Sequence, residues 1–263
     1  MPLTRNRIRE IRSLAEKSGR DEQGLFVAEG LRLVGDAAAS AFEIPEAFST
    51  AEFSATAEGA HLMGILRARG TLVSEVTYRE LAQCADTVTP QGVIALVRTK
   101  SESASGLLKR LSAPSLIVAL DGIADPGNLG SIIRTCDWFG AGGIFLGKGS
   151  VDPYNPKAVR STMGGIFHVP VASGLDLPAV AGEARSGGYT VYVAETGADR
   201  DEADVRWADR SLIALGNEAH GVSDELARAA DARVAVRRYG AAESLNVGVA
   251  CGILLAAHRR QHG

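Results

Sequence analysis

Residues 115–147, SLIVALDGIADPGNLGSIIRTCDWFGAGGIFLG, decide the fold of the second half of this chain. The continuous apolar and β-branched run LIVAL predicts a strand that is buried on both faces. A loop rich in glycine and proline follows, then a helix predicted over residues 129–139 and a second apolar strand, GGIFLG. Apolar strands that alternate with helices are typical of a parallel sheet covered on both sides.

The same alternation continues toward the C-terminus. We predict strands in FHVPVA (167–172), YTVYVAE (189–195) and SLIALGN (211–217), with helices between them. The apolar tract 245–257 is expected to be a buried helix, because a bilayer span needs ~20 residues. Residues 115–263 therefore form a predicted α/β domain, and we expect no contact with a membrane.

A smaller α/β unit is predicted in front of this domain. Apolar residues at helical spacing, with arginines on the other faces, predict a basic amphipathic helix over residues 5–17. Short apolar runs then alternate with helical patterns. The polar, serine-rich residues 99–114 end at Pro114 and predict a linker, so that residues 1–98 form the first domain.

Charge and cysteine content narrow the possible partners. The formal net charge is −3, but phosphate contacts need only a local positive potential, and the first twenty residues are rich in arginine. Cys84, Cys136 and Cys251 lie far apart, which indicates neither a disulfide framework nor a CxxC metal site. The N-terminus carries no apolar signal segment. We expect a reduced, cytoplasmic protein without metal, with Cys136 and Cys251 in the core.

Three glycine-marked loops follow strands of the second domain. They are DGIADPGNLGSIIRT (121–135), ALGNEAHGVSDE (214–225) and VRRYGAAESLNVGVA (236–250). In an open parallel sheet, ligands bind beyond the carboxyl ends of the strands, where helix N-termini offer free N–H groups. The chain has neither a GxGxxG that opens a helix nor a Walker pattern. A nicotinamide-dependent oxidoreductase therefore lacks its fingerprint, and another kind of ligand is expected.

Together, the three loops resemble the signature motifs of the SpoU/TrmH family, the RNA 2′-O-ribose methyltransferase branch of the SPOUT superfamily. The matching residues are Asp125, Pro126, Gly127, Asn128, Gly130 and Arg134 in the first motif, Gly216, Glu218, Gly221 and Ser223 in the second, and Gly240, Ser244, Leu245, Asn246 and Val247 in the third. The segments REIRSLAEKSGR (9–20), LFVAEGLRLV (25–34) and QGVIALV (91–97) resemble the substrate-binding domain of the family's ribosomal-RNA branch. The resemblance covers nearly the whole chain.

The resemblance implies a SPOUT-type parallel sheet with a deep trefoil knot, a ribosomal-protein-like α/β domain in front, and a homodimer. It implies S-adenosyl-L-methionine as cofactor and a ribose of structured RNA, most of all large-subunit ribosomal RNA, as substrate. By matching position, the cofactor would be held by Leu215, Gly216, Val236 and Leu245. The reaction site would be lined by Asn128, Arg134, Glu218, Ser244 and Asn246. We expect RNA contacts from Arg5, Arg7, Arg9, Arg12, Arg237 and Arg238.

The reaction requires that a ribose hydroxyl lose its proton while it attacks a methyl group. The resemblance places Arg134 at that hydroxyl, yet a guanidinium is effectively always protonated. Two roles stay open. Arg134 could be a base deprotonated with the help of an RNA phosphate, or a cation that orients phosphate and stabilises the oxyanion.

Each of these residues also has a plainer explanation when taken alone. Arg134 could form a surface ion pair, and Asn128 could cap the helix that follows it. Glu218, Ser244 and Asn246 could be local hydrogen-bonding residues at helix starts. Their joint occurrence favours a site. Two functional alternatives remain beside the ribosomal enzyme: a noncatalytic RNA-binding protein that retains the fold, and a tRNA 2′-O-methyltransferase.

The third motif departs from the family pattern. Where the family commonly has an apolar residue, proline and methionine before the glycine, this chain has Val236, Arg237, Arg238 and Tyr239. The added positive charge could lie in a solvated loop or contact RNA phosphate, and we favour the RNA contact.

Overall fold

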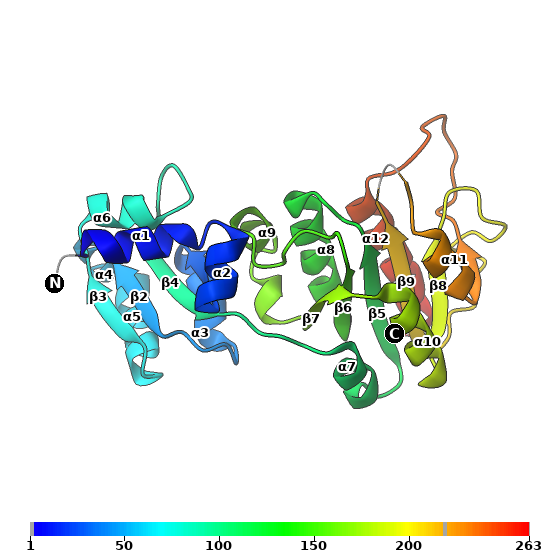
Figure 1. Cartoon of the computed structure of the whole chain (residues 1–263), viewed down its shortest axis with the longest axis horizontal. Helices are drawn as coiled ribbons and strands as arrows, with labels where there is room; N and C mark the ends of the chain where they lie inside the picture. The colour runs from blue at the N-terminus through cyan, green and yellow to red at the C-terminus, as the bar shows by residue number, and fades with distance from the viewer. Residues whose placement is uncertain (1–2, 218–219, 263) are drawn as a thin grey trace. The chain divides into compact units, whose positions relative to one another are not determined.

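The structure is a computed structural model that describes residues 3–217 and 220–262. The chain forms two compact units (Figure 1). Unit 1 holds the residues up to Lys100 together with Tyr154–Phe167, and unit 2 holds Ser101–Pro153 and the residues from His168 onward. Residues 154–167 therefore belong to unit 1, although they lie in sequence between two strands of the sheet of unit 2.

A four-stranded sheet forms the centre of unit 1. In spatial order its strands are β1 (Leu25–Glu29), β4 (Val93–Arg98), β2 (Glu46–Ser49) and β3 (Leu72–Glu75). β4 runs antiparallel to β1 and β2, and its apolar run VIALV is buried throughout. The helices of this unit are α1 (Arg5–Ser13), α2 (Lys17–Gln23), α3 (Leu31–Ala39), α4 (Ala51–Ser54), α5 (Ala57–Ala68), α6 (Tyr78–Cys84) and α9 (Pro156–Ser161).

The predicted helix over residues 5–17 is wrong in length, because the chain turns between α1 and α2. The buried Arg20 donates hydrogen bonds to the carbonyls of Leu14 and Ala15, both at 2.8 Å, and so satisfies carbonyls at the end of α1. Gly19 packs closely against α1: a Cβ there would lie 2.1 Å from the carbonyl oxygen of Ser13. The turn leaves α1 as a separate, solvent-facing helix.

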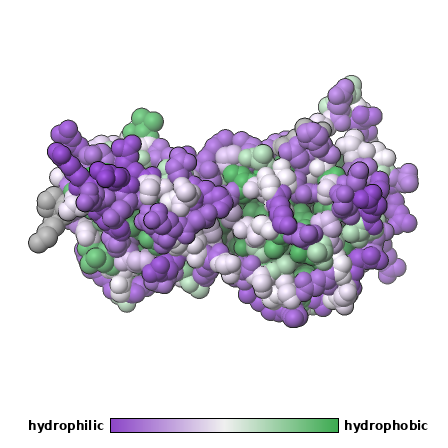
Figure 2. Space-filling view, viewed as in Figure 1, coloured by the Kyte–Doolittle hydropathy of each residue, from purple (hydrophilic) through white to green (hydrophobic). Residues whose placement is uncertain are grey.

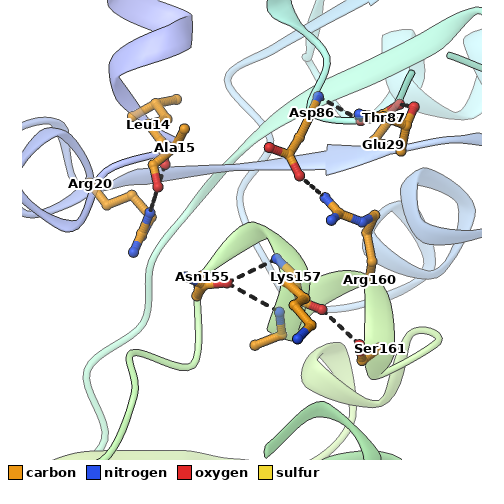
Figure 3. A network of polar contacts seen from close by, with 11 residues as sticks. Leu14, Ala15, Arg20, Glu29, Asp86, Thr87, Asn155, Lys157, Arg160 and Ser161 are labelled. Atoms are coloured by element: carbon orange, nitrogen blue, oxygen red, sulfur yellow. Dashed lines mark hydrogen bonds and ion pairs between the residues drawn. The ribbon is translucent and has the colours of Figure 1, made fainter. Parts of the chain in front are cut away.

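The segment 154–167 is bound to unit 1 by ring stacking and by polar contacts. Tyr154 stacks on the buried Phe26 at 4.7 Å between ring centroids. Figure 3 shows Arg160 of α9 reaching Asp86, while Glu29 of β1 holds the neighbouring loop by accepting hydrogen bonds from Asp86 and Thr87. These contacts attach α9 to the loop after α6 and that loop to β1.

A six-stranded parallel sheet forms the centre of unit 2, which confirms the predicted α/β class. Its spatial order is β10 (Ala232–Val234), β8 (Thr190–Ala194), β9 (Arg210–Gly216), β5 (Ser115–Asp121), β6 (Gly143–Gly147) and β7 (Val171–Leu175). The helices of unit 2 are α7 (Ala104–Arg110), α8 (Pro126–Trp138), α10 (Leu177–Ser186), α11 (Asp224–Ala229) and α12 (Val247–His262). Core residues such as Ile117, Phe145 and Leu212 are at most 1% exposed.

Two local expectations for unit 2 are corrected. The predicted strand 167–172 begins only at Val171, because Phe167 ends a 3-10 turn and Pro170 has no N–H to donate to a ladder. Residues 99–114, predicted as a linker, contain helix α7, which begins after a Ser103 cap. Among the described residues, no helix is both long and apolar enough to cross a membrane.

Candidate functional site

Three loops of unit 2 emerge at one edge of its sheet. All its strands are parallel, so their carboxyl ends share that edge. β5 and β9 are neighbours, with Asp121 beside Gly216 at their ends. From this pair the sheet extends one way through β6 to β7 and the other way through β8 to β10. Such a switch point is where open α/β sheets bind ligands.

The first loop leads into α8 through a cap. The side chain of Asp125 accepts a hydrogen bond from the Asn128 N–H at 2.8 Å, and Pro126 occupies the first helical position. The helix therefore begins at Pro126, three residues before the predicted start. Asn128 consequently lies in the first turn of α8, at the sheet edge.

Hydrogen bonds hold the second loop against the first. Asp121, the last residue of β5, accepts bonds from the N–H and the hydroxyl of Ser223 at 2.8 and 2.7 Å. The Nδ2 of Asn217 donates to the carbonyl of Gly122 at 3.0 Å. Hydrogen bonds to a carboxylate are stronger than neutral ones, so Asp121 is the main tie between these two loops.

The backbone of the second loop folds back on the end of β9. Gly221 donates its N–H to the carbonyl of Asn217 at 2.8 Å. A Cβ at Gly216 would lie 1.9 Å from the carbonyl carbon of Gly221, so a larger residue has no room there. Glu218, predicted to line the reaction site, lies outside the described residues.

The third loop is joined to the first by a pair of asparagines. Asn246 donates from Nδ2 to the Oδ1 of Asn128 at 2.9 Å. Its own Oδ1 accepts from the N–H groups of Gly248 and Val249, at 3.0 and 3.3 Å, at the start of α12. One side chain thus caps α12 and ties it to α8. Asn246 is thus a helix cap, as the plainer explanation states, and it also binds Asn128 of the first motif.

Arg134 lies on the solvent-facing side of α8. Its side chain is exposed, as are those of Ser131 and Trp138 on the same helix. No hydrogen bond or ion pair joins Arg134 to another residue in the part of the chain that the structure describes. The plainer explanation of a surface ion pair therefore finds no support among those residues, and the guanidinium is available to a substrate.

The predicted cofactor-binding residues differ in burial. Leu215 is buried in β9, whereas Gly216 and Val236 are half-buried. Leu245 is 48% exposed, and Ser244 beside it is exposed as well. Leu245 and Val236 thus offer apolar surface next to accessible backbone, which suits a ligand with a flat apolar ring and polar edges.

The predicted RNA-binding arginines fall into two groups. Arg5, Arg9 and Arg12 are exposed on α1 at helical spacing, and no ion pair between described residues holds them. Arg7 is paired with Glu10 and Glu46. Near the third motif, Arg237 is paired with acidic residues, whereas Arg238 is exposed and has no ion pair with a described residue. Figure 2 shows mainly hydrophilic surface over α1.

Two buried groups, Cys136 on α8 and His258 on α12, have shifted pKa values. Burial, followed by a hydrogen bond to Cys251, raises the pKa of the Cys136 thiol well above its ordinary range. Both thiols are free and buried, as predicted, and join α8 to α12 as core residues. Burial also lowers the pKa of His258 to about 4, so its ring is neutral at pH 7.

Sequence reasoning missed Asp121 and Asn217 as site residues. Both belong to quoted motifs, and each directly follows or ends a buried strand, which is the signal that could have found them. Their hydrogen bonds hold the first two loops together.

Comparison with known proteins identifies both halves of the chain. Residues 115–256 match the model of the SpoU rRNA Methylase family, and residues 5–95 match the MRM3-like substrate binding domain. A crystal structure of an rRNA methyltransferase from Sinorhizobium meliloti with bound AdoMet is 32% identical, covers 99% of this chain and 97% of that one, and superposes with a TM-score of 0.87.

Two relatives have named activities. The 23S rRNA (guanosine(2553)-2′-O)-methyltransferase of Bacillus subtilis is 36% identical over 65% of this chain and 65% of its own length. The mitochondrial rRNA methyltransferase 3A of Danio rerio is 30% identical over 99% of this chain and 69% of its own. The chain therefore spans about two thirds of the length of these curated relatives.

Proposed function

The chain belongs to the SpoU rRNA Methylase family, and on that basis we propose that it methylates the 2′-oxygen of a ribose in ribosomal RNA, with S-adenosyl-L-methionine as donor. One structural observation supports this most. The ties from Asp121 to Ser223 and from Asn128 to Asn246 join all three motif loops at the sheet edge, and Arg134, farther along α8, is exposed and has no partner among the described residues.

The residues at this edge fit the cofactor. Leu245 and Val236 present apolar surface for the adenine ring, and Gly216, half-buried at the end of β9, lies beside them in the proposed site. We therefore assign Leu215, Gly216, Val236 and Leu245 to cofactor binding. When bound, S-adenosyl-L-methionine supplies a methyl group on a positively charged sulfur.

The reaction needs a nucleophilic ribose oxygen in line with that methyl group. Asn128 and Asn246, which fix each other, would orient the ribose. Arg134 would bind the adjacent phosphate and stabilise the oxygen while its proton passes to solvent water, since a guanidinium donates well and rarely loses its own proton. Ser244, exposed beside Leu245, and Glu218 complete the proposed set.

Unit 1 would bind RNA through those arginines of α1 that have no ion pair with a described residue. Arg5, Arg9 and Arg12 form a positive stripe on one face of this helix. Arg12 also lines a hollow of about 520 Å³, together with Glu29 and Arg160. Folded RNA is recognised mainly by shape and by unpaired loops, so a charged helix beside a hollow suits it.

We also propose a homodimer that forms through α8 and α12, which pack on each other in unit 2. Trp138 on α8 is 85% exposed and Val249 on α12 is 52% exposed, and such large apolar side chains favour burial against a second copy. Family membership further implies the trefoil knot. The buried free cysteines suit a reducing compartment, such as the cytoplasm.

The proposed function is tested by incubating the protein with ribosomal RNA and tritiated S-adenosyl-L-methionine. We expect label in RNA that survives as a 2′-O-methylated nucleoside after nuclease digestion. A noncatalytic RNA-binding protein would bind RNA without transfer, and transfer to tRNA alone would identify a tRNA enzyme.

A further inference from the structure

The segment between β10 and α12 projects from unit 2, and its root is pinned to the loop after β8 (Figure 1). The N–H of Ala235 donates to the carbonyl of Arg200, and the N–H of Glu202 donates to the carbonyl of Ala235, both at 2.8 Å. Asp201 pairs with Ala235 as a parallel β-bridge. The projecting segment therefore begins from a fixed position at the carboxyl edge of the sheet.

Arg237 reinforces this root with its side chain. Its guanidinium lies 2.6 Å from carboxylate oxygens of both Asp201 and Asp204, and its N–H donates to the Glu202 carboxylate at 2.9 Å. The hydrogen bond to Asp201, then one to Tyr239, raises the pKa of Arg237. Because Asp201 and Asp204 pair with the charge of Arg237, we assign this residue a positioning role in place of the RNA contact predicted from the sequence.

The next two side chains are accessible, and that of Tyr239 is hydrogen-bonded to Arg237. Arg238 is exposed, and no ion pair or hydrogen bond joins it to a described residue. Tyr239 is 89% exposed, among the most exposed large side chains of the described chain. An accessible aromatic ring beside a free guanidinium suits an unpaired nucleotide: bases stack on aromatic rings, and arginine binds phosphate.

We propose that Arg238 and Tyr239 bind one unpaired nucleotide of the substrate RNA, with the tyrosine ring stacked on the base and the guanidinium at a phosphate. Arg237 is a positioning residue. Its ion pairs with Asp201 and Asp204 fix the segment that carries Arg238 and Tyr239. The inference rests on the proposed function, because β10 ends at the same sheet edge as β5 and β9 and so brings the nucleotide to the reaction site.

The test measures binding of a fluorescent single-stranded RNA of about 12 nucleotides to the full chain, by anisotropy at several salt concentrations. Tyr239→Ala should weaken binding roughly fivefold or more, and Tyr239→Phe should restore it because the ring remains. Arg238→Ala should reduce the slope of log affinity against log salt by about 0.7, the value for one phosphate on a single strand.

Arg237→Ala separates positioning from direct contact. It should weaken binding while leaving the salt slope unchanged, since Arg237 meets no phosphate. Arg233→Ala is the matched control: Arg233 is an exposed arginine of β10 paired with Glu195, and its loss should change neither affinity nor slope. Thermal unfolding of each variant checks that the fold is intact.

Several results would overturn the proposal. They are wild-type affinity in both Tyr239→Ala and Arg238→Ala, absence of binding by the wild-type protein, or a slope lowered by Arg237→Ala. The proposed function fails separately, if the wild-type protein transfers no methyl group to ribosomal RNA while the dependence of RNA binding on Tyr239 persists.

Discussion

The side-chain amides of Asn128 and Asn246 are hydrogen-bonded at 2.9 Å, although 118 residues separate them in the sequence. The bond joins the first turn of α8 to the residue that caps α12. The contact joins the first motif to the third, and we propose that the two form one site.

Removing either amide should therefore loosen the same contact. We expect Asn128→Ala and Asn246→Ala each to lower methyl transfer by up to roughly 100-fold, because small displacements of orienting groups are costly. In a double-mutant cycle the two effects should be strongly non-additive. Additive losses in the transfer rate would show that the two residues work independently.

Arg134 is expected to act on the transition state rather than on cofactor binding. Arg134→Ala should reduce the transfer rate roughly 10²- to 10³-fold while calorimetry shows S-adenosylhomocysteine binding largely retained. Arg228→Ala on α11 removes another exposed helical arginine and should leave the rate unchanged.

The lysine variant distinguishes the two possible roles of Arg134. If the guanidinium is a stabilising cation, Arg134→Lys should recover part of the rate without a new pH dependence, since an ammonium also carries the charge. If Arg134 is a base, the lysine amine should give a rate that rises with pH toward its own pKa.

Asp121 should be needed for the second motif loop to keep its position. Asp121→Asn can still accept one bond from Ser223 but loses the charge that strengthens both, so we expect a loss of about 1–3 kcal/mol in the free energy of unfolding. Urea denaturation measures this loss, and weaker S-adenosylhomocysteine binding should accompany it. Unchanged ligand affinity would remove Asp121 from the support of the cofactor site.

Acid should destabilise unit 2 through His258. The folded pKa of about 4 lies below the ordinary value of 6.5, so the unfolded chain binds the extra proton first as pH falls. Stability should drop between pH 6.5 and about 4 by up to about 3 kcal/mol, and should stay level above that window. His258→Leu should flatten this part of the profile, whereas a variant of the exposed His168 should not. An unchanged profile in His258→Leu would contradict the assignment.

Residues 154–167 should stabilise unit 1. A fragment of residues 1–100 lacks the rings of Tyr154 and Phe167 that stack on Phe26 at 4.7 and 6.1 Å. We expect it to be less stable than unit 1 in the full chain by about 2–3 kcal/mol, from the apolar area left exposed. Hydrogen exchange of β1 amides compares the two, and equal protection would contradict this.

Much of the fold could be predicted because its signals are local. The apolar runs LIVAL and GGIFLG fall in β5 and β6, as predicted. The wrong predictions lie where a residue outside the local pattern determines where an element ends. α1 ends at Ser13, and Arg20 binds the carbonyls of Leu14 and Ala15 just after it, a contact that no pattern within residues 5–17 predicts.

The candidate site could be predicted only in part, for a similar reason. The motif residues were visible in the sequence, and the family resemblance gave them roles. The bond between Asn128 and Asn246 depends on the packing of α8 against α12, and the pairing of Arg237 depends on an acidic loop more than thirty residues away. Contacts between residues that are distant in sequence determine which arginine side chains are left without an ion pair. The sequence alone does not reveal such contacts.

Methyl transfer by matched wild-type and Arg134→Ala proteins tests the central claim most directly. The substrate is ribosomal RNA, and the product is analysed as nucleosides after digestion. We predict label in a 2′-O-methylated nucleoside with the wild-type protein and a roughly 10²- to 10³-fold slower appearance with the variant. Label on a base, or equal rates for the two proteins, would contradict the account.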